Sequence, residues 1–380
     1  MAYYQPIDDN LLSRIFRLPW IMILVIIGLG VFGVAVLYSA TITNPTEANL
    51  PGVHAVRVGI AVVFLFVLAM IPLNLWSAVA YGAYFAALLM LLGVEFYGAM
   101  GGGAQRWLEF GGRRVQPSEF MKLALLLALA RFYHQQLVNG PAKFYHHLIA
   151  LVMIGAPVAL VFKQPDLGTA LMLAATGFAV MFFAGLRYWM IILTVAVGIC
   201  SAPLAYFYVL KDYQRERVLT AIDPSRDPLG AGYQIQQAEI AIGSGGAEGR
   251  GYMKGTQSQL DYIPEQHTDF IFTVIAEEFG FVGSVGLLAA WCLVLGIGLA
   301  IAGRCRSYFG YLAASGAVVT IAFYVIVNIG MVSGLLPVVG VPLPFISYGG
   351  TAMMTVMAAL AVICAVNLDR DRHLSLTGLF

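Results

Sequence analysis

Ten long apolar stretches alternate with shorter polar segments along the whole chain. A helix needs about 20 apolar residues to cross a bilayer, and it satisfies its own backbone polar groups there. The fourth and sixth stretches are short, whereas the eighth is long enough to contain a break near Gly280. The predicted spans are Trp20–Ala40, Val53–Leu73, Trp76–Val94, Pro117–Phe132, His147–Phe162, Leu167–Ala184, Tyr188–Tyr208, Phe270–Ala302, Phe309–Gly334 and Gly349–Val366. The pattern predicts an all-α polytopic membrane protein.

The polar segments divide the chain into three parts. Residues 1–19 and 368–380 are predicted tails, and residues 20–367 are the transmembrane domain. Within that domain, residues 211–268 form a large external loop between the seventh and eighth spans. A loop this long is usually functional or disordered, and its aromatic, glycine and paired-charge content favours order. Residues 234–242 are expected to form a short amphipathic helix that lies on the membrane.

Composition supports this assignment. The 380 residues are 60% hydrophobic and only 11% charged, against roughly 25% charged residues in soluble domains. A net charge of +1 argues against a nucleic-acid or acidic partner. The first residues show no removable signal peptide. Because Cys200, Cys292, Cys305 and Cys364 lie in or beside apolar runs without CxxC spacing, we expect small buried hydrophobes rather than disulfides or metal ligands.

The cations of the short loops predict the orientation. One set falls on a single side of the membrane in this arrangement: Arg14, Arg17, Arg131, Lys143, Arg187, Arg304, Arg306, Arg370 and Arg372. The positive-inside rule makes that side cytoplasmic, with both termini inside. The opposite side carries as many cations, but mostly in the two long segments Glu95–Gln116 and Lys211–Thr268, which escape the rule.

The most informative residue is Asp269, which lies where the large loop ends and the eighth span begins. An ionisable group at the edge of a bilayer is costly to desolvate and marks a functional site by default. The alternative is a helix cap, a role that Thr268 could also fill. On a helical period Glu277 lies on the side of Asp269, about two turns deeper, and could share its cavity, whereas Glu278 would hydrogen-bond to another helix.

A second polar segment runs from Gly101 to Lys122. Glu119 and Lys122 are three residues apart and could pair on one face of a helix that begins near Pro117. The segment has two interpretations. It is either an interfacial loop with an aromatic anchor and a structural ion pair, or an anion-binding loop. In the second case Trp107 lies against a sugar or lipid, and the cations that face phosphate oxygens are Arg106, Arg113, Arg114 and Lys122.

Three further motifs favour structural roles. Gly28, Gly30 and Gly33 match G-x-G-x-x-G, but they lie inside the first span without a preceding strand, so close helix packing explains them better than a nucleotide. Asp166 is expected to cap the sixth span, with a direct role in chemistry as the alternative. Residues 334–350 are apolar yet rich in helix breakers, which predicts a re-entrant wall beside the site.

Taken together, five blocks resemble the SEDS family (shape, elongation, division and sporulation): Gly103–Trp107, Gln116–Glu119, Gln164–Thr169, His267–Phe272 and Pro344–Gly350. They occur in the family's order and cover nearly the whole chain. Gly255–Leu260 and Gly340–Pro344 resemble the elongation branch more than the division branch. The resemblance implies an inner-membrane glycosyltransferase that polymerises lipid II, with Asp269 as the essential carboxylate. It also implies functional roles for Trp107 and Lys122.

The resemblance further implies partners, namely a class B penicillin-binding protein and other membrane proteins of the elongation machinery. In the expected inverting reaction Asp269 takes a proton from the acceptor hydroxyl, and cations or a divalent ion (Mg²⁺ or Mn²⁺) meet the diphosphate. The expected substrate-binding residues are Arg106, Trp107, Glu119, Lys122, Arg215, Arg217, Lys254, His267 and Glu277. The alternatives are a lipid II flippase, which needs a polar path across the membrane, and a structural scaffold.

Overall fold

The computed structural model describes residues 10–101, 104–110, 113–138, 140–208, 212–227, 230–260, 262–263, 265–372 and 374. The helices that coincide with the ten predicted spans are α2 (Trp20–Thr41), α3 (Leu50–Ala69), α4 (Leu73–Tyr97), α5 (Pro117–Leu137), α6 (Phe144–Lys163), α7 (Leu167–Phe183), α8 (Tyr188–Tyr208), α12 (Ile271–Arg304), α13 (Tyr308–Val332) and α14 (Gly350–Leu368). In the described chain, seven of them (α2, α3, α4, α6, α12, α13 and α14) are long and apolar enough to cross a membrane, and α7 is apolar but shorter. The all-α polytopic prediction is confirmed.

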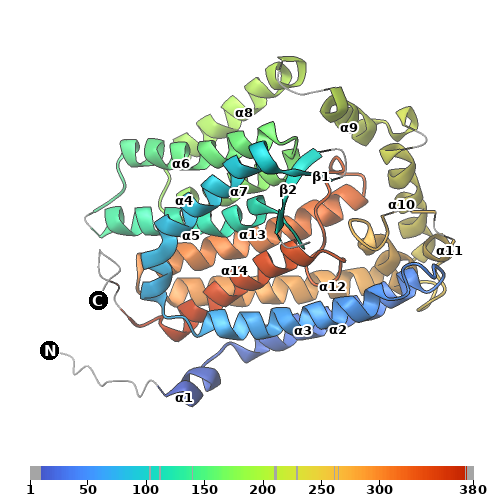
Figure 1. Ribbon diagram of the computed structural model, residues 1–380, viewed down its shortest axis with the longest axis horizontal. Helices are drawn as coiled ribbons and strands as arrows, with labels where there is room; N and C mark the ends of the chain where they lie inside the picture. Colours follow the sequence, from blue (N-terminus) through green and yellow to red (C-terminus); the bar gives the residue numbers. More distant parts are fainter. Residues whose placement is uncertain are drawn as a thin grey trace.

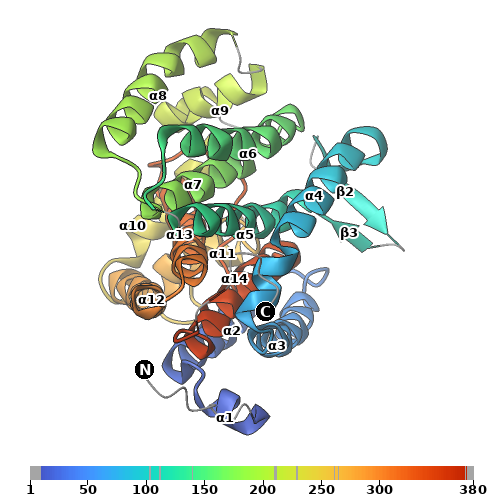
Figure 2. The same cartoon turned by 90° about the vertical axis from the view of Figure 1, so that its left-hand side faces the viewer.

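The remaining elements are short. They comprise α1 (Leu11–Phe16), α9 (Asp212–Ile222), the 3-10 helix η1 (Pro224–Arg226), α10 (Ala231–Gly245), α11 (Thr256–Gln259) and the strands β1 (Ala99–Gly101), β2 (Ala104–Phe110) and β3 (Arg113–Val115). The strands form an antiparallel sheet in the order β1-β2-β3, which the sequence pattern did not predict. Figure 2 shows β2 and β3 projecting from the side of the bundle.

The helices form an elongated bundle in which α2, α3, α12 and α14 run alongside one another (Figure 1). Helix α1 and the last turns of α14 lie at one end of this bundle, and α9, α10 and α11 lie at the other (Figure 1). Helix α13 contacts α5, α7, α12 and α14. Together α13 and α14 form the most deeply buried part of the fold, because neighbouring helices surround them.

Glycines allow two close approaches in this bundle. A Cβ at Gly30 would lie 2.7 Å from Val58 of α3, and a Cβ at Gly33 would lie 2.3 Å from the carbonyl oxygen of Phe345. The packing interpretation is therefore confirmed for Gly30 and Gly33, whereas a Cβ at Gly28 would meet nothing within 4 Å. The break near Gly280 is also confirmed: this residue has φ +64° inside α12, a conformation that favours glycine.

The kink leaves backbone carbonyls of α12 without helical partners. The amides of Arg250 and Gly251 donate to the carbonyls of Glu277 and Glu278, each at 3.0 Å. Helix α10, which contains the predicted segment 234–242, packs on α12 with Ile235, Ala238 and Ala241 buried. The helix is thus confirmed, and these three apolar residues pack against protein rather than outward. Its placement on the membrane surface stays a prediction.

Two smaller expectations, the burial of the cysteines and the role of Glu278, have different outcomes. Cys200 and Cys292 lie on the surface of the molecule, while Cys364 is buried as expected. Glu278 behaves as expected, since it accepts a hydrogen bond from Ser39 of α2.

Several cations of the predicted cytoplasmic side gather at the end of the bundle that carries α1 and the last turn of α14. Asp369, which follows α14, pairs with Arg14 at 3.7 Å and with Arg372 at 3.5 Å. The backbone of Arg306 donates to the carbonyl of Arg370. This grouping agrees with the placement of these residues on one side of the membrane.

Candidate active site

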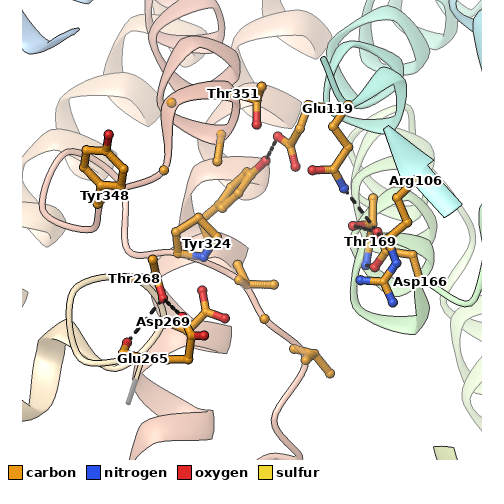
Figure 3. A pocket seen from close by; sticks show the side chains of 18 of the residues that line it. Arg106, Glu119, Asp166, Thr169, Glu265, Thr268, Asp269, Tyr324, Tyr348 and Thr351 are labelled. Atoms are coloured by element: carbon orange, nitrogen blue, oxygen red, sulfur yellow. Dashed lines mark hydrogen bonds and ion pairs between the residues drawn. The ribbon is translucent and has the colours of Figure 1, made fainter. Parts of the chain in front are cut away.

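A cavity of about 710 Å³ opens near the end of the bundle opposite α1. Its walls come from α3, β2, α5, α7, α9, α10, α13, α14 and the turn before α12. Ionisable side chains in its lining are Arg57, Arg106, Glu119, Lys122, Asp166, Arg217, Glu265, Asp269, Tyr324 and Tyr348. Glu265, Thr268 and Asp269 lie on one side, and Arg106, Asp166 and Thr169 lie on the other (Figure 3).

Asp269 lies in the turn that precedes α12. The helix begins at Ile271, and its cap residue Phe270 makes no side-chain cap bond. The Thr268 hydroxyl instead donates to the carboxylate of Glu265 at 2.7 Å. The cap interpretation of Asp269, and its alternative at Thr268, are therefore wrong.

The carboxylate of Asp269 has unusual surroundings. Among the described residues none donates a hydrogen bond to it, and the nearby Gly340 would place a Cβ only 3.3 Å from Oδ2. Burial raises its pKa to about 6, and the negative charge of Glu265 adds to this, while Arg217 opposes it. A carboxylate with a pKa close to neutral is suited to general base catalysis, because it is ionised yet still basic.

The facing wall carries a buried network on α5 and α13. The ammonium of Lys122 donates to Glu119 and to the hydroxyl of Tyr324, both at 2.6 Å. The Tyr324 hydroxyl donates in turn to the other oxygen of Glu119. The predicted pairing of Glu119 with Lys122 is confirmed. Both residues also line the cavity. The structural ion pair and the predicted functional role therefore involve the same two side chains.

Arg106 reaches the cavity from β2 and is held at the start of α7. Its guanidinium donates to the carbonyl of Pro165 and lies 4.0 Å from Asp166. Asp166 accepts hydrogen bonds from the amide and hydroxyl of Thr169, at 3.2 and 2.9 Å. The predicted cap of α7 is therefore confirmed. Trp107, next to Arg106, also lines the cavity.

Two further cations line the cavity, and unlike Arg106 and Lys122 they form no salt bridge with a described carboxylate. Arg57 of α3 lies over the ring of Tyr348 at 4.3 Å, and Arg217 of α9 makes a long contact, 3.4 Å, with the carbonyl of Val338. Within the described residues neither guanidinium forms a salt bridge with a carboxylate. These are the cavity cations whose charge is available to an anion.

Four predicted site residues lie outside the cavity. Arg215 pairs with Asp212 at 3.6 Å, and His267 faces Glu47 at 3.5 Å. Lys254 is exposed on the segment that follows α10. Glu277 is fully buried and accepts hydrogen bonds from the amides of Gln257 and Ser258.

The prediction that Glu277 shares the cavity of Asp269 is therefore wrong, because its carboxylate is used to cap α11. The assignments of Arg215, Lys254 and His267 to a substrate contact are likewise not supported by their placement. The side chains of Arg113 and Arg114 lie outside the described residues.

The irregular segment 334–349 forms another wall, as predicted. Val338, Gly340 and Pro342 line the cavity. Its backbone groups find partners in protein: the Asn328 amide donates to the carbonyl of Val341 at 2.7 Å, and the Ser347 hydroxyl accepts from the amide of Leu343 at 2.8 Å. Val341 and Leu343–Ser347 are buried in protein, as non-helical backbone at membrane depth requires, whereas Leu335, Leu336 and Gly340 are exposed.

The sequence also predicts a divalent ion as one source of positive charge. The described residues contain no group of three or more His, Cys, Asp or Glu side chains placed to hold a metal. Asp269 and Glu265 are carboxylates of the cavity lining, and the Thr268 hydroxyl donates to one oxygen of Glu265. The divalent ion, held in part by the diphosphate, stays a prediction.

Comparisons with known proteins identify the family. The family model for FtsW, RodA and SpoVE, described as "Cell cycle protein", matches residues 17–372. The peptidoglycan glycosyltransferase MrdB of Escherichia coli K12 is 42% identical over 349 residues, which cover 92% of this chain and 93% of that protein. A probable peptidoglycan glycosyltransferase FtsW of Geobacter metallireducens is 34% identical over 94% of this chain and 96% of its own.

Solved structures agree with this result. A chain of a peptidoglycan synthase complex matches with a TM-score of 0.81 and 33% identity, covering 94% of this chain and 99% of its own. The rod shape determining protein RodA of Thermus thermophilus matches with a TM-score of 0.70 and 29% identity, covering 94% and 98%. The chain therefore belongs to the FtsW/RodA/SpoVE family, which is the SEDS family that its sequence blocks resemble.

Proposed function

We propose that this protein is a peptidoglycan glycosyltransferase that polymerises lipid II during cell elongation, with Asp269 as the general base. The observation that carries this proposal is the half-buried Asp269 carboxylate at the edge of a large cavity, with its pKa raised to about 6 and with no described hydrogen-bond donor. Relatives named as peptidoglycan glycosyltransferases support the reaction class.

The reaction joins two lipid II molecules. The 4-hydroxyl of the acceptor N-acetylglucosamine attacks the anomeric carbon of the donor N-acetylmuramic acid, and its proton passes to Asp269. The bond from that carbon to undecaprenyl pyrophosphate breaks, so the new β-1,4 linkage forms with inversion. A base near the hydroxyl and positive charge near the leaving group are the two requirements.

The two requirements fall on different parts of the cavity. Lys122 and Arg106 are already close to Glu119 and Asp166. Arg57 and Arg217 have no described carboxylate partner, so we assign the growing charge of the diphosphate mainly to them. Trp107 stays a proposed platform for sugar or lipid, and a diphosphate-bound Mg²⁺ or Mn²⁺ stays a proposed source of further charge, which chelation would test.

The proposal includes a location and a partner. We place the protein in the inner membrane. The end that carries Arg14, Arg306, Arg370 and Arg372 then faces the cytoplasm, because cations gather there. The cavity then faces the periplasm, where a class B penicillin-binding protein would crosslink the product. The structural similarity to a chain of a peptidoglycan synthase complex supports such a partnership.

The test is polymerisation of purified lipid II in detergent by purified protein, alone and with its penicillin-binding partner. Wild type should form glycan strands, and Asp269→Asn should form none while its thermal melt is unchanged or higher. Sealed vesicles with labelled lipid II test the flippase alternative. Robust flipping by Asp269→Asn, with no polymer from wild type plus partner, would overturn the enzyme in favour of a transporter.

A further inference from the structure

Helix α13 carries two polar side chains that the proposed reaction does not yet use. Tyr324 and Asn328 are four residues apart, so they lie on one face of the helix. Both are completely buried. A polar group inside an apolar bundle costs free energy unless it is hydrogen-bonded, so the partners of these two residues indicate what they do.

Tyr324 contacts the α5 wall of the cavity. Its hydroxyl accepts a hydrogen bond from Lys122 at 2.6 Å and donates one to Glu119. The ammonium of Lys122 also lies 4.4 Å from the centre of the Tyr324 ring. One side chain of α13 therefore holds both members of the α5 ion pair, and Tyr324 itself lines the cavity between Glu119 and Asp269 (Figure 3).

Asn328 contacts the wall that carries the base. Its amide nitrogen donates to the carbonyl of Asp269 at 2.9 Å and to the carbonyl of Val341 at 2.7 Å. The two N–H groups of one amide thus tie the backbone of Asp269 to the irregular segment beside it. Because no described donor holds the carboxylate itself, its direction depends on how this backbone is fixed.

We propose that Tyr324 and Asn328 are positioning residues, and that α13 sets the separation and direction of the Asp269 carboxylate and the Lys122 ammonium across the cavity. This inference rests on the proposed function. It predicts two different kinetic signatures. Loss of the Asn328 amide moves the base and lowers kcat, whereas loss of the Tyr324 hydroxyl releases Lys122 and raises KM.

The same helix offers a matched control. Thr320 lies four residues before Tyr324, is buried, and shares a hydrogen bond of 3.1 Å with Thr176 of α7. It does not line the cavity. Thr320→Val removes a buried polar contact between α13 and a neighbour without touching Lys122 or Asp269, so it reports what packing alone contributes.

The experiment compares Asn328→Leu, Tyr324→Phe and Thr320→Val with wild type in the lipid II assay, with rates normalised to folded protein. Misplacement of a catalytic group by about 1 Å costs about 100-fold in rate. We therefore expect Asn328→Leu to lower kcat about 10- to 100-fold, with KM within about twofold of wild type. Tyr324→Phe should mainly raise KM, and Thr320→Val should change neither constant.

The pH profile provides a readout that a packing defect would not move. The acid limb of kcat/KM reports the base in the free enzyme. Ionisable groups that face the cavity with Asp269 are Glu265 beside it, Arg217 of α9, Arg57 of α3, Glu119 and Lys122 of α5, Arg106 of β2, Asp166 before α7, and Tyr324 and Tyr348. If Asn328→Leu lets the carboxylate turn toward water, the limb moves to lower pH, whereas Thr320→Val leaves it in place.

The outcomes separate this inference from the proposed function. If wild type polymerises lipid II but Asn328→Leu matches Thr320→Val in kcat, KM and acid limb, the positioning role is overturned. Failure of wild type to form any polymer would instead contradict the proposed function.

Discussion

Two aspartates lie near opposite ends of α14. Their surroundings differ, and the difference separates a structural carboxylate from the one we propose as the general base. Asp369, directly after the helix, is 3% exposed and lies near Arg14 and Arg372, while the amide of Leu73 donates to it at 2.9 Å. Asp269 lies beside the segment that leads into the helix. It is half-buried, the negative charge of Glu265 acts on it, and no described group donates to it.

The contrast shows that burial alone does not identify a reactive carboxylate. Asp369 is surrounded by donors that stabilise its charge, so its ionised form is held as part of the fold. Asp269 has one opposing cation, Arg217, and a neighbouring negative charge that raises its pKa. A buried acid without hydrogen-bond donors costs stability, and a functional site is where such a cost is tolerated.

The largest effect expected is that of Asp269→Asn on activity. General base catalysis contributes about 10²- to 10⁴-fold, so polymerisation should fall by that factor or below detection. Stability should not fall. The pKa of Asp269 is raised to about 6 in the folded chain, so the charged form destabilises the fold above that pH, and the neutral amide removes this cost. Gel analysis of polymer and a thermal melt check both parts; a lower melt together with lost activity would indicate a structural role instead.

Arg217→Gln should have the next largest effect, with Arg215→Gln as its control. A hydrogen bond to a charged group contributes about 1.5–3 kcal/mol, which corresponds to about 10- to 100-fold in affinity. Arg217 lines the cavity, whereas Arg215 donates to the carbonyl of Phe207 and pairs with Asp212 outside it. Saturation kinetics should show a raised KM for lipid II in the first variant and little change in the second. Equal effects of the two substitutions on KM would mean that the position of Arg217 in the cavity gives it no special role in binding lipid II.

Much of this arrangement could be predicted from the sequence. The ten helices follow from the lengths of the apolar stretches, and Asp269 stands out because it is an acid at the entrance of a span. The pairing of Glu119 with Lys122 follows from their spacing on one helix. These predictions depend on local periodicity, which an apolar environment enforces strongly.

The predictions that failed depend on contacts between segments distant in the sequence. Glu277 was assigned to the cavity by counting helical turns from Asp269, but the helix begins at Ile271 and its second turn faces α11. Arg215 and Arg217 differ by two positions, and nothing in the sequence shows which of them faces inward.

Arg57 and the pair Tyr324 and Asn328 left signals that the sequence analysis did not use. Arg57 is a charged residue inside the predicted span Val53–Leu73, and such a residue marks a functional site by default. Tyr324 and Asn328 are polar residues one turn apart inside the span Phe309–Gly334. Their spacing indicates a polar face, but their partners on α5 and before α12 are visible only in the fold.

Lowering the pH should reduce the activity of wild type by a smaller factor than Asp269→Asn or Arg217→Gln does. Because the pKa of Asp269 is about 6, kcat/KM should be nearly constant at neutral pH and fall by about tenfold for each unit below that value. An ordinary, solvated aspartate would place this limb near its usual pKa of about 3.9. Initial rates across this range, with protein stability checked at each pH, decide between the two. A flat profile down to about pH 5 would contradict the raised pKa of the base.

Asp369→Asn should have the smallest effect on the reaction and a measurable effect on the fold. Replacing the carboxylate leaves the guanidinium groups of Arg14 and Arg372 without their acid, and a lost buried partner costs about 1–3 kcal/mol. The thermal melt should fall, while the rate per folded molecule stays within about twofold of wild type, because the cavity lies at the other end of α14. The melt and the normalised polymerisation rate check these two expectations together. An inactive Asp369→Asn variant with a normal melt would show that this end of the bundle takes part in function, and the distinction between the two aspartates would then be lost.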